Sequence, residues 1–268
     1  MEAAREAGKS TGIVVTSEIT DATPASFSAH QKSRSEYELI AEDISKCGAE
    51  VLFGGGKQYF LPKSEGGART DNRNLLKEME DNQYVVVANK SEMENVKSGK
   101  VIGLFKEGNL STPYPEDETG AEPTLEQMTV KAIEMLSANS KGFVLMVEGS
   151  KIDKVASKND ETRMINETIH FDNAIKAAVD FAEKDGKTLV IVTADHETGG
   201  LLMPENVQPY KGMKIKGNWT TTEHTINHVL VYAYGPQSIE FTGMMDNTDI
   251  PKKLSAILGL KDFPKLME

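Results

Sequence analysis

The fold is decided by Phe143-Val-Leu-Met-Val147 and Thr188-Leu-Val-Ile-Val-Thr193, two apolar runs of strand length with a long helical pattern between them. The helical pattern covers Glu161 to Asp185, and the following Gly186 predicts the end of the helix. A strand, a helix and a second strand in this order predict a parallel pair joined by a helical crossover.

Further strand and helix patterns alternate along the rest of the chain. Runs rich in β-branched residues predict strands at Gly12–Thr16, Val51–Phe53, Tyr84–Ala88 and Val229–Tyr234. Amphipathic stretches predict helices at Tyr37–Lys46, Asn74–Glu80 and Leu125–Ala138. We therefore expect an α/β fold with a largely parallel sheet flanked by helices on both faces. Residues 1–268 are expected to form one such domain, with an irregular excursion at 199–222.

The composition is strongly acidic and excludes several classes of partner. Lys and Arg number 30 and Asp and Glu number 41, which gives a formal net charge of −11. Such a surface repels polyphosphate backbones and anionic lipid, so we expect neither nucleic acid nor a membrane as partner. The apolar runs are also far shorter than the roughly 20 residues of a membrane helix. An anionic substrate would need local positive charge from bound cations or a focused arginine.

Polar residues follow the predicted strands at the edge where ligands bind in parallel sheets. Asp195-His196 directly follows the strand at Thr188–Thr193, and a carboxylate beside an imidazole suits a borderline divalent ion such as Zn²⁺. The alternative is an Asp that caps a turn and a His that makes one hydrogen bond. Glu148 and Asp153 form a second acidic pair, for which helix caps or solvated charges are the alternative. His224, taken alone, is equally compatible with a structural role.

Taken together, these segments resemble a known family. They include Val147-Glu-Gly-Ser-Lys-Ile-Asp153, Thr188-Leu-Val-Ile-Val-Thr-Ala-Asp-His-Glu-Thr-Gly-Gly200 and Ser17-Glu-Ile-Thr-Asp-Ala-Thr-Pro24, with Ser33-Arg34 and Glu223-His-Thr225. These motifs are similar to the signatures of bacterial alkaline phosphatases, and the matches occur in the same order along essentially the whole chain. The same motifs argue against a related phosphodiesterase or phosphomutase, which remains an alternative.

The resemblance implies a role for each matched residue. It implies that Thr23 and Glu148 bind Mg²⁺, that Asp195 and His196 bind one Zn²⁺, and that Asp153 and His224 bind a second Zn²⁺. Arg34 would act in catalysis by holding two phosphate oxygens through its planar guanidinium group. Lys154 would contact phosphate through water, with a solvated surface lysine as the alternative. Two zinc ions and an arginine would supply the positive charge that the acidic chain otherwise lacks.

The sequence departs from the family pattern at two places. The family has a zinc-ligating His four residues after the Asp matched by Asp153, and this chain has Ser157 there. We therefore expect the second zinc site to be weakened, with His228 as a candidate substitute ligand. The family's nucleophilic serine finds no match in these residues either, so we expect an incomplete, truncated form of the fold that is inactive alone.

The resulting hypothesis is a metal-dependent hydrolase that acts on phosphomonoesters through a phosphoserine intermediate. Its ligands would be a phosphomonoester or inorganic phosphate, and the family resemblance allows a homodimer. The resemblance also implies a periplasmic or secreted location, although no signal peptide is recognised in this sequence. The alternative from a different class is a non-catalytic module that binds metal or phosphate without turnover.

Overall fold

The computed structural model describes residues 1–111, 120–202, 217–260 and 263, and its centre is a five-stranded parallel sheet. The strand order is β3-β4-β2-β1-β5, and all four neighbouring pairs run parallel. The strands of this sheet are β1 (Ser10–Glu18), β2 (Val51–Gly55), β3 (Tyr84–Val87), β4 (Lys100–Leu104) and β5 (Phe143–Glu148). The predicted α/β fold with a largely parallel sheet is therefore confirmed.

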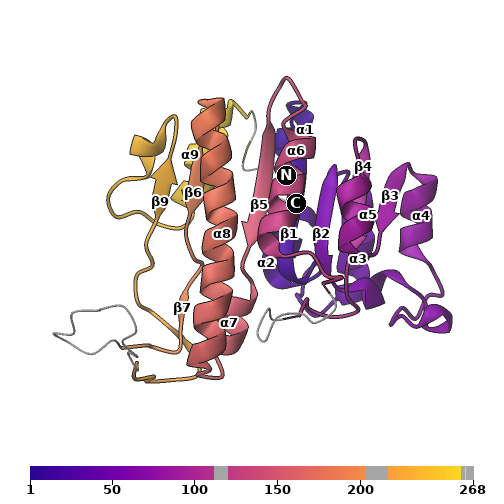
Figure 1. Ribbon diagram of the computed structural model, residues 1–268, viewed down its shortest axis with the longest axis horizontal. Helices are drawn as coiled ribbons and strands as arrows, with labels where there is room; N and C mark the ends of the chain where they lie inside the picture. The colour runs from indigo at the N-terminus through magenta and orange to yellow at the C-terminus, as the bar shows by residue number, and fades with distance from the viewer. Residues whose placement is uncertain (112–119, 203–216, 261–262, 264–268) are drawn as a thin grey trace.

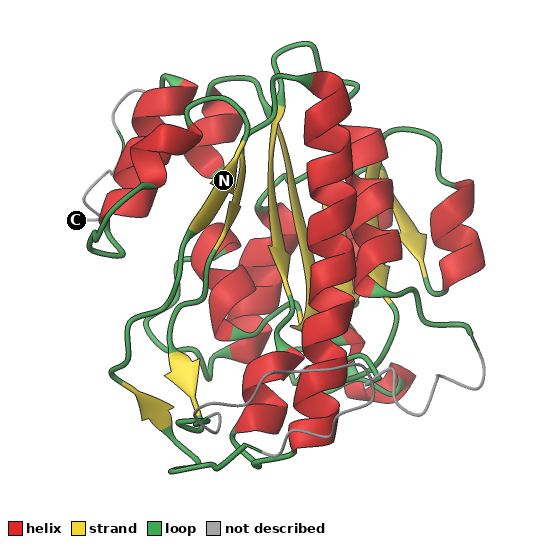
Figure 2. Cartoon of the chain, turned by 60° about the vertical axis from the view of Figure 1, so that its left-hand side comes forward, coloured by secondary structure: helices red, strands yellow, loops and turns green. Residues whose placement is uncertain are grey.

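Helices cover both faces of the sheet, as Figures 1 and 2 show. They are α1 (Glu2–Glu6), α2 (Ala22–Ser28), α3 (Tyr37–Lys46), α4 (Leu75–Asp81), α5 (Lys90–Asn95), α6 (Leu125–Leu136), α7 (Lys151–Ala156), α8 (Glu161–Asp185) and α9 (Asp249–Leu258). Short 3₁₀ turns lie at Lys57–Phe60, Lys63–Glu65 and Ser238–Phe241.

Alternation along β1 explains the two-sided core. Ile13 and Val15 pack into a cluster with residues of α3 and α4, whereas Val14 packs with residues of α5, α6 and α8. Successive strand residues point to opposite faces, so an unbroken apolar run is buried only when both faces are covered.

α6 begins at a capping box. The Thr124 side chain accepts a hydrogen bond from the backbone N–H of Gln127, and the Gln127 side chain accepts one from the backbone N–H of Thr124.

Two of the predicted strands lie outside the parallel sheet. The run at Thr188–Thr193 contains β6 (Val190–Val192), and the run at Val229–Tyr234 contains β9 (Tyr232–Tyr234). These two strands pair antiparallel as a separate sheet. A second small antiparallel pair joins β7 (Glu197–Thr198) to β8 (His224–Thr225). Figure 2 shows this short pair well apart from the long strands of the main sheet.

The excursion predicted at 199–222 is described only at its two ends, because 203–216 lie outside the described residues. There Leu202 bridges Asn218 in antiparallel fashion. Gly199 has φ of +92°, and a Cβ atom at this position would lie 2.4 Å from the ring of Trp219. Glycine is therefore required here both by its backbone conformation and by the packed indole. In the part of the chain that the structure describes, none of the helices combines the length and apolar character that a bilayer crossing demands.

Candidate metal and phosphate site

Three short elements bring a metal-binding group together beyond the strand ends. Asp153 lies on α7, which follows β5, and His196 lies in the turn between β6 and β7. His224 lies on β8, directly opposite Thr198 of β7 in the antiparallel pair. The β7–β8 pairing thus carries His224 from a distant part of the sequence to the loop that holds His196.

The group formed by Asp153, His196 and His224 has the spacing of a cation site. Each residue offers one ligand atom, and these atoms lie within 4.8 Å of one another. His224 Nε2 is 3.4 Å from Asp153 Oδ1. The two imidazole rings stack with centroids 3.4 Å apart and planes inclined by 20°. Two ring nitrogens and one carboxylate oxygen form a donor set that suits Zn²⁺.

Thr198 links two members of this group. The Thr198 hydroxyl donates to Asp153 Oδ1 at 2.6 Å. The Thr198 hydroxyl oxygen also lies 3.1 Å from His196 Nδ1. A hydroxyl that donates to the carboxylate can accept from the imidazole N–H, which leaves the lone pair of His196 on Nε2. Thr198 therefore fixes the orientation of a carboxylate and an imidazole at once.

Asp195 behaves differently from its neighbour His196. Its side chain is 74% exposed, and one carboxylate oxygen accepts from the backbone N–H of His196 at 3.1 Å. The other oxygen lies 3.2 Å from His196 Nε2. In the structure His196 thus groups with Asp153 and His224, while Asp195 contacts this group through His196.

A second cluster places two cations on one carboxylate. Asp21 Oδ1 accepts from Arg34 Nη2 at 2.8 Å, and Asp21 Oδ2 accepts from Lys154 Nζ at 2.5 Å. Burial alone would raise the pKa of Asp21, but the hydrogen bonds from Lys154 and the Ala22 N–H, together with Arg34, outweigh this and lower it. Asp21 thereby holds both residues predicted to bind phosphate, and it neutralises one of their two charges.

Glu148 and Thr23 approach each other at the end of β5. Burial raises the pKa of the Glu148 carboxyl, while hydrogen bonds from Ser150 and Thr23 oppose this shift. The Ser150 hydroxyl donates to Glu148 Oε2 at 2.7 Å. The charges of Asp21 and Asp195 raise the same pKa further. Oxygen donors of this kind are what Mg²⁺ prefers.

Comparison with known proteins shows the family. The family model described as alkaline phosphatase matches residues 1–217 and 205–260. Alkaline phosphatase 4 of Bacillus subtilis is 36% identical over 320 residues, which cover 93% of this chain and 67% of that relative. This protein belongs to the alkaline phosphatase family.

Solved alkaline phosphatases share its fold. The enzyme from the Antarctic bacterium TAB5 is 34% identical and superposes with a TM-score of 0.83 over 97% of this chain and 75% of that one. A mutant of the TAB5 alkaline phosphatase, described with Mg bound in its M3 site, matches with the same TM-score and coverage.

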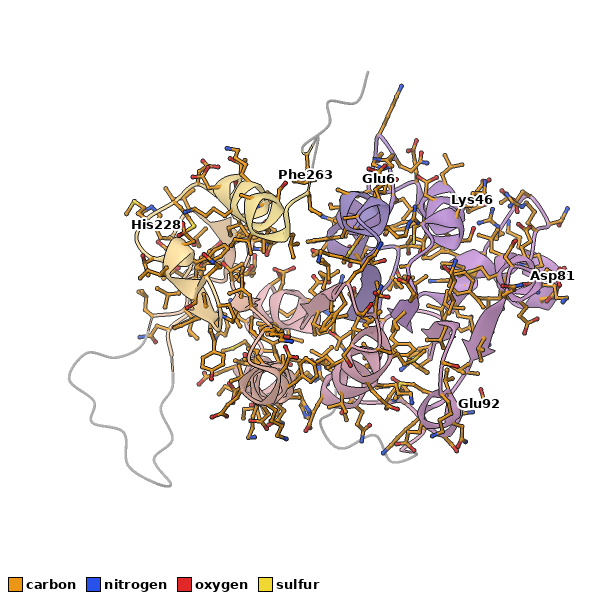
Figure 3. The ribbon with its side chains drawn as sticks, turned by 90° about the horizontal axis from the view of Figure 1, so that it is seen from above. Glu6, Lys46, Asp81, Glu92, His228 and Phe263 are labelled. Atoms are coloured by element: carbon orange, nitrogen blue, oxygen red, sulfur yellow. The ribbon has the colours of Figure 1, made fainter. Side chains whose placement is uncertain are left out.

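Ser157 lies where an alkaline phosphatase ligand is expected, one helical turn after Asp153. It forms the C-cap of α7 with α-helical backbone angles, and its N–H donates to the Asp153 carbonyl at 2.9 Å. Residues four apart share a helix face, so position 157 is on the side of Asp153. His228 is exposed at the outer margin of the molecule (Figure 3) and is not part of the group around Asp153. The proposed substitution of His228 for the lost ligand thus gains no support.

Two residues at the candidate site, Asp21 and Thr198, were not predicted from the sequence. Asp21 lies in the Asp-Ala-Thr-Pro motif beside Thr23, and its carboxylate accepts hydrogen bonds from both Arg34 and Lys154. Thr198 lies in the Asp-His-Glu-Thr motif, which by itself assigns it no role. The motifs therefore contained a signal for both residues, but only the fold reveals which groups they contact.

Proposed function

We propose that this protein supplies the metal-binding and phosphate-binding residues of an alkaline phosphatase that hydrolyses phosphomonoesters through a phosphoserine intermediate. The observation that carries the proposal is the approach of Asp153, His196 and His224, from three separate segments, to within 4.8 Å of one another. Family membership supports the phosphatase function, and phosphate esters follow as the substrate class.

We assign the group around Asp153 to a zinc ion, because two imidazoles and a carboxylate fit its ligand preference. When bound, the ion would supply Lewis-acid stabilisation of phosphoryl oxygens. Thr198 would orient Asp153 and His196 toward it. Asp195, next to His196, would contribute to a second zinc ion as the sequence suggests. Thr23 and Glu148 would hold Mg²⁺, an assignment in keeping with the Mg-bound TAB5 variant.

Arg34 and Lys154 would bind the phosphate. The Arg34 guanidinium has five N–H donors, and Asp21 accepts from one of them, so four remain, enough to engage a pair of phosphate oxygens. Asp21 would keep the guanidinium and the Lys154 ammonium on one side of the site. The serine nucleophile has no assigned counterpart in these 268 residues. The 268-residue polypeptide is therefore expected to show no phosphoserine formation when assayed by itself.

The remaining features of the hypothesis follow the family. Residues 1–268 would form one alkaline phosphatase-like domain with its irregular excursion at 199–222, and a homodimer in a periplasmic or secreted location would be the working form. The strongly acidic charge of −11 supports the exclusion of nucleic acid and membrane partners.

Zinc calorimetry tests the proposal directly. We expect the wild-type chain to bind zinc and His224→Ala to bind it at least about tenfold more weakly, because a ligand is lost. The matched control is His228→Ala, which removes an exposed imidazole four residues away and should leave the affinity unchanged. Equal affinities of wild type and His224→Ala would contradict the site.

Turnover assays distinguish the alternatives. A phosphatase predicts hydrolysis of a chromogenic phosphomonoester over a diester once the nucleophile is supplied, whereas a related phosphodiesterase predicts the reverse. A non-catalytic module predicts zinc or phosphate binding with no turnover of either. Phosphoserine trapped at low pH in stoichiometric amount on the 268-residue polypeptide would contradict our placement of the nucleophile outside these residues.

A further inference from the structure

The β7–β8 pair is held together by its own hydrogen bonds. Glu197 of β7 accepts from the Thr225 hydroxyl of β8 and from the backbone N–H of Gly200. The Gly199 N–H donates to the Glu223 carbonyl at 3.0 Å, which adds a backbone bond beside the ladder. These bonds connect the two strands to each other. They do not fix the position of the pair relative to α7, the helix beside which β7 packs (Figure 1).

The metal-binding group is divided between α7 and this strand pair. Asp153 lies on α7, whereas His224 lies on β8 and His196 directly precedes β7. His224 Nε2 is 3.4 Å from Asp153 Oδ1, so a cation bound by both would bridge the two parts. Metal–ligand distances are kept within about 0.2 Å of their preferred values. The position of β8 relative to α7 therefore has to be fixed closely for such a cation to bind well.

Asn159 lies in the turn after α7, and its side chain connects the two parts. Its amide group lies 3.1 Å from the Ala156 carbonyl oxygen and 2.9 Å from the Thr221 carbonyl oxygen. Both oxygens are acceptors, so the amide nitrogen faces them and donates one N–H to each. Ala156 is the last residue of α7, and Thr221 lies three residues before His224. The Asn159 amide thus links the end of α7 to the segment that leads into β8.

The backbone of this turn does not itself require an asparagine side chain. Asn159 has φ of +53°, in the left-handed region where asparagine is enriched among non-glycine residues. Its N–H donates to the Ala156 carbonyl at 2.8 Å, and the Asp160 N–H donates to the Val155 carbonyl at 3.1 Å. Glycine adopts the same φ more easily but has no side chain to donate. The bond to Thr221 is therefore a contribution of the amide alone.

Thr198 provides a further link, at a different point of the strand pair. Its hydroxyl donates to Asp153 Oδ1 and so connects β7 to α7. A single link would leave the pair free to pivot about it, whereas two separate links fix its orientation. The Asn159 bond supplies a link on the side of β8, the strand that carries His224.

Close packing at the same place sets how near the two parts can approach. A Cβ atom built on Gly199 would lie 2.4 Å from the Trp219 ring and 3.3 Å from the Ala156 carbonyl oxygen. The end of β7, the indole and the end of α7 are therefore in contact. Packing of this kind resists closer approach, and the Asn159 hydrogen bond resists separation.

We propose that Asn159 is a positioning residue for the metal-binding group. Its amide holds the segment before β8 against the end of α7 and thereby sets the distance between His224 and Asp153. The inference rests on the proposed zinc site, to which Asn159 contributes no ligand atom of its own. The alternative is a turn residue that supports the fold without affecting where His224 lies.

The test compares substitutions at two left-handed positions. Asn159→Gly removes the amide and keeps the turn accessible to the backbone. Asn159→Asp keeps the size of the side chain, but an ionised carboxylate cannot donate to two carbonyls. Asn72 also has a left-handed backbone, with φ of +60°, and is exposed. Asn72→Gly is therefore the control for introducing a glycine at such a position.

Hydrogen exchange of the chain after chelation of metal tests the link without any bound ion. The loss of one hydrogen bond should make amides of residues 218–225 exchange roughly threefold to tenfold faster in both Asn159 variants. The same amides in Asn72→Gly should exchange as in wild type, and β3 should be unchanged in every variant. Wild-type exchange of residues 218–225 in both Asn159 variants would overturn the proposal.

Proton NMR of the same metal-free samples reports the position of His224 itself. The chain has five histidines, so their ring signals can be assigned by single substitutions. Stacking of His196 on His224, with centroids 3.4 Å apart, should shift the ring protons of both upfield relative to the exposed His228. In Asn159→Gly these signals should move toward those of His228. Unchanged ring shifts together with faster exchange would indicate the turn residue of the alternative and would overturn the positioning role.

Zinc calorimetry then measures the consequence for the ligands. Zinc affinity should fall roughly threefold to tenfold in both Asn159 variants, in line with one lost hydrogen bond, and should be unchanged in Asn72→Gly. Wild-type affinity in both Asn159 variants would overturn the proposal. Absence of zinc binding by the wild-type chain would instead contradict the proposed zinc site, and hydrogen exchange and the ring shifts would still decide whether Asn159 positions His224.

Discussion

The two parts of this molecule bury their strands to very different degrees. In the parallel sheet, β2 and seven residues of β1 are buried. From β6 onward the strands are half-buried or exposed, and Tyr232 of β9 is 61% exposed. Phe241 is the last buried apolar side chain along the described chain. The parallel sheet is thus stabilised by its own buried core. The segment from β6 onward has little buried core, so its stability depends on its contacts with other groups.

The metal-binding group lies where these two parts meet. Asp153 belongs to the helix after β5, whereas His196 and His224 belong to the less buried part. A cation held by all three would connect the parts, because ligand binding stabilises the state that presents the complete site. The following predictions test this difference between the well-buried parallel sheet and the less buried segment from β6 onward.

The largest expected effect is in the core of the sheet. Phe53 is 0% exposed and packs near Phe105, with ring centroids 5.9 Å apart. Phe53→Ala should lower the free energy of unfolding by about 3–5 kcal/mol, because the cavity cannot fully collapse. The matched truncation Tyr232→Ala should cost less than about 1 kcal/mol, since most of that side chain is in water. Urea denaturation gives both values, and similar losses would refute the contrast.

The next effect concerns the departure at Ser157. Ser157→His places an imidazole one turn from Asp153 on the same helix face and should raise zinc affinity about tenfold or more. The gain should also raise the melting temperature in excess zinc. Lys158→His is the control, because the adjacent position points to another side. Zinc affinity is measured by calorimetry. Equal affinity of Ser157→His and wild type would show that position 157 is not where a zinc ligand is missing.

A smaller effect is expected at Arg34. Arg34→Lys keeps the charge but replaces a planar fork with a point charge, so phosphate affinity should fall roughly threefold to tenfold. Arg163→Lys provides the control, because Arg163 pairs with Asp160 on the surface of α8. Phosphate calorimetry in the presence of zinc is the measurement. An unchanged affinity in Arg34→Lys would remove Arg34 from the phosphate site.

The smallest effect is a pH dependence in the sheet. Burial, with the charges of Cys47 and Glu50, raises the pKa of Tyr84 above its ordinary value of 10.0. The folded state therefore favours the neutral phenol. Its contribution to stability is complete below pH about 10 and is lost as pH rises through the folded pKa.

Tyr84→Phe isolates this contribution. It removes a 2.8 Å hydrogen bond to the Ala49 carbonyl and should cost about 1 kcal/mol at neutral pH. The variant should also lose less stability than wild type between pH 9 and 11. Tyr232→Phe, at an exposed position, should leave the wild-type pH profile unchanged. A larger loss of stability between pH 9 and 11 in Tyr84→Phe than in wild type would contradict the raised pKa of Tyr84.

The sequence predicted most of the parallel sheet because buried strands leave clear apolar runs. It missed β4 as a strand, since Lys-Val-Ile-Gly-Leu contains only a short β-branched segment with a glycine. It also placed β6 and β9 with the other strands, because an apolar run records burial and not the identity of its neighbour. Pairing depends on which segments are available to pair.

For the site, motifs identified the ligand types but not their grouping. The sequence pairs His196 with Asp195, and these two side chains lie 3.2 Å apart in the structure, which also groups His196 with Asp153 and His224. The stacking of the two imidazoles depends on the β7–β8 ladder, which spans a long excursion and leaves no local signal. The role of Thr198 likewise follows only from that ladder.

Zinc-edge anomalous scattering from crystals of the chain grown with zinc tests the central claim most directly. The account predicts a strong peak within about 2.0–2.2 Å of a carboxylate oxygen of Asp153 and one nitrogen each of His196 and His224. Zinc bound only at exposed imidazoles such as His228, with these three side chains free of metal, would contradict it.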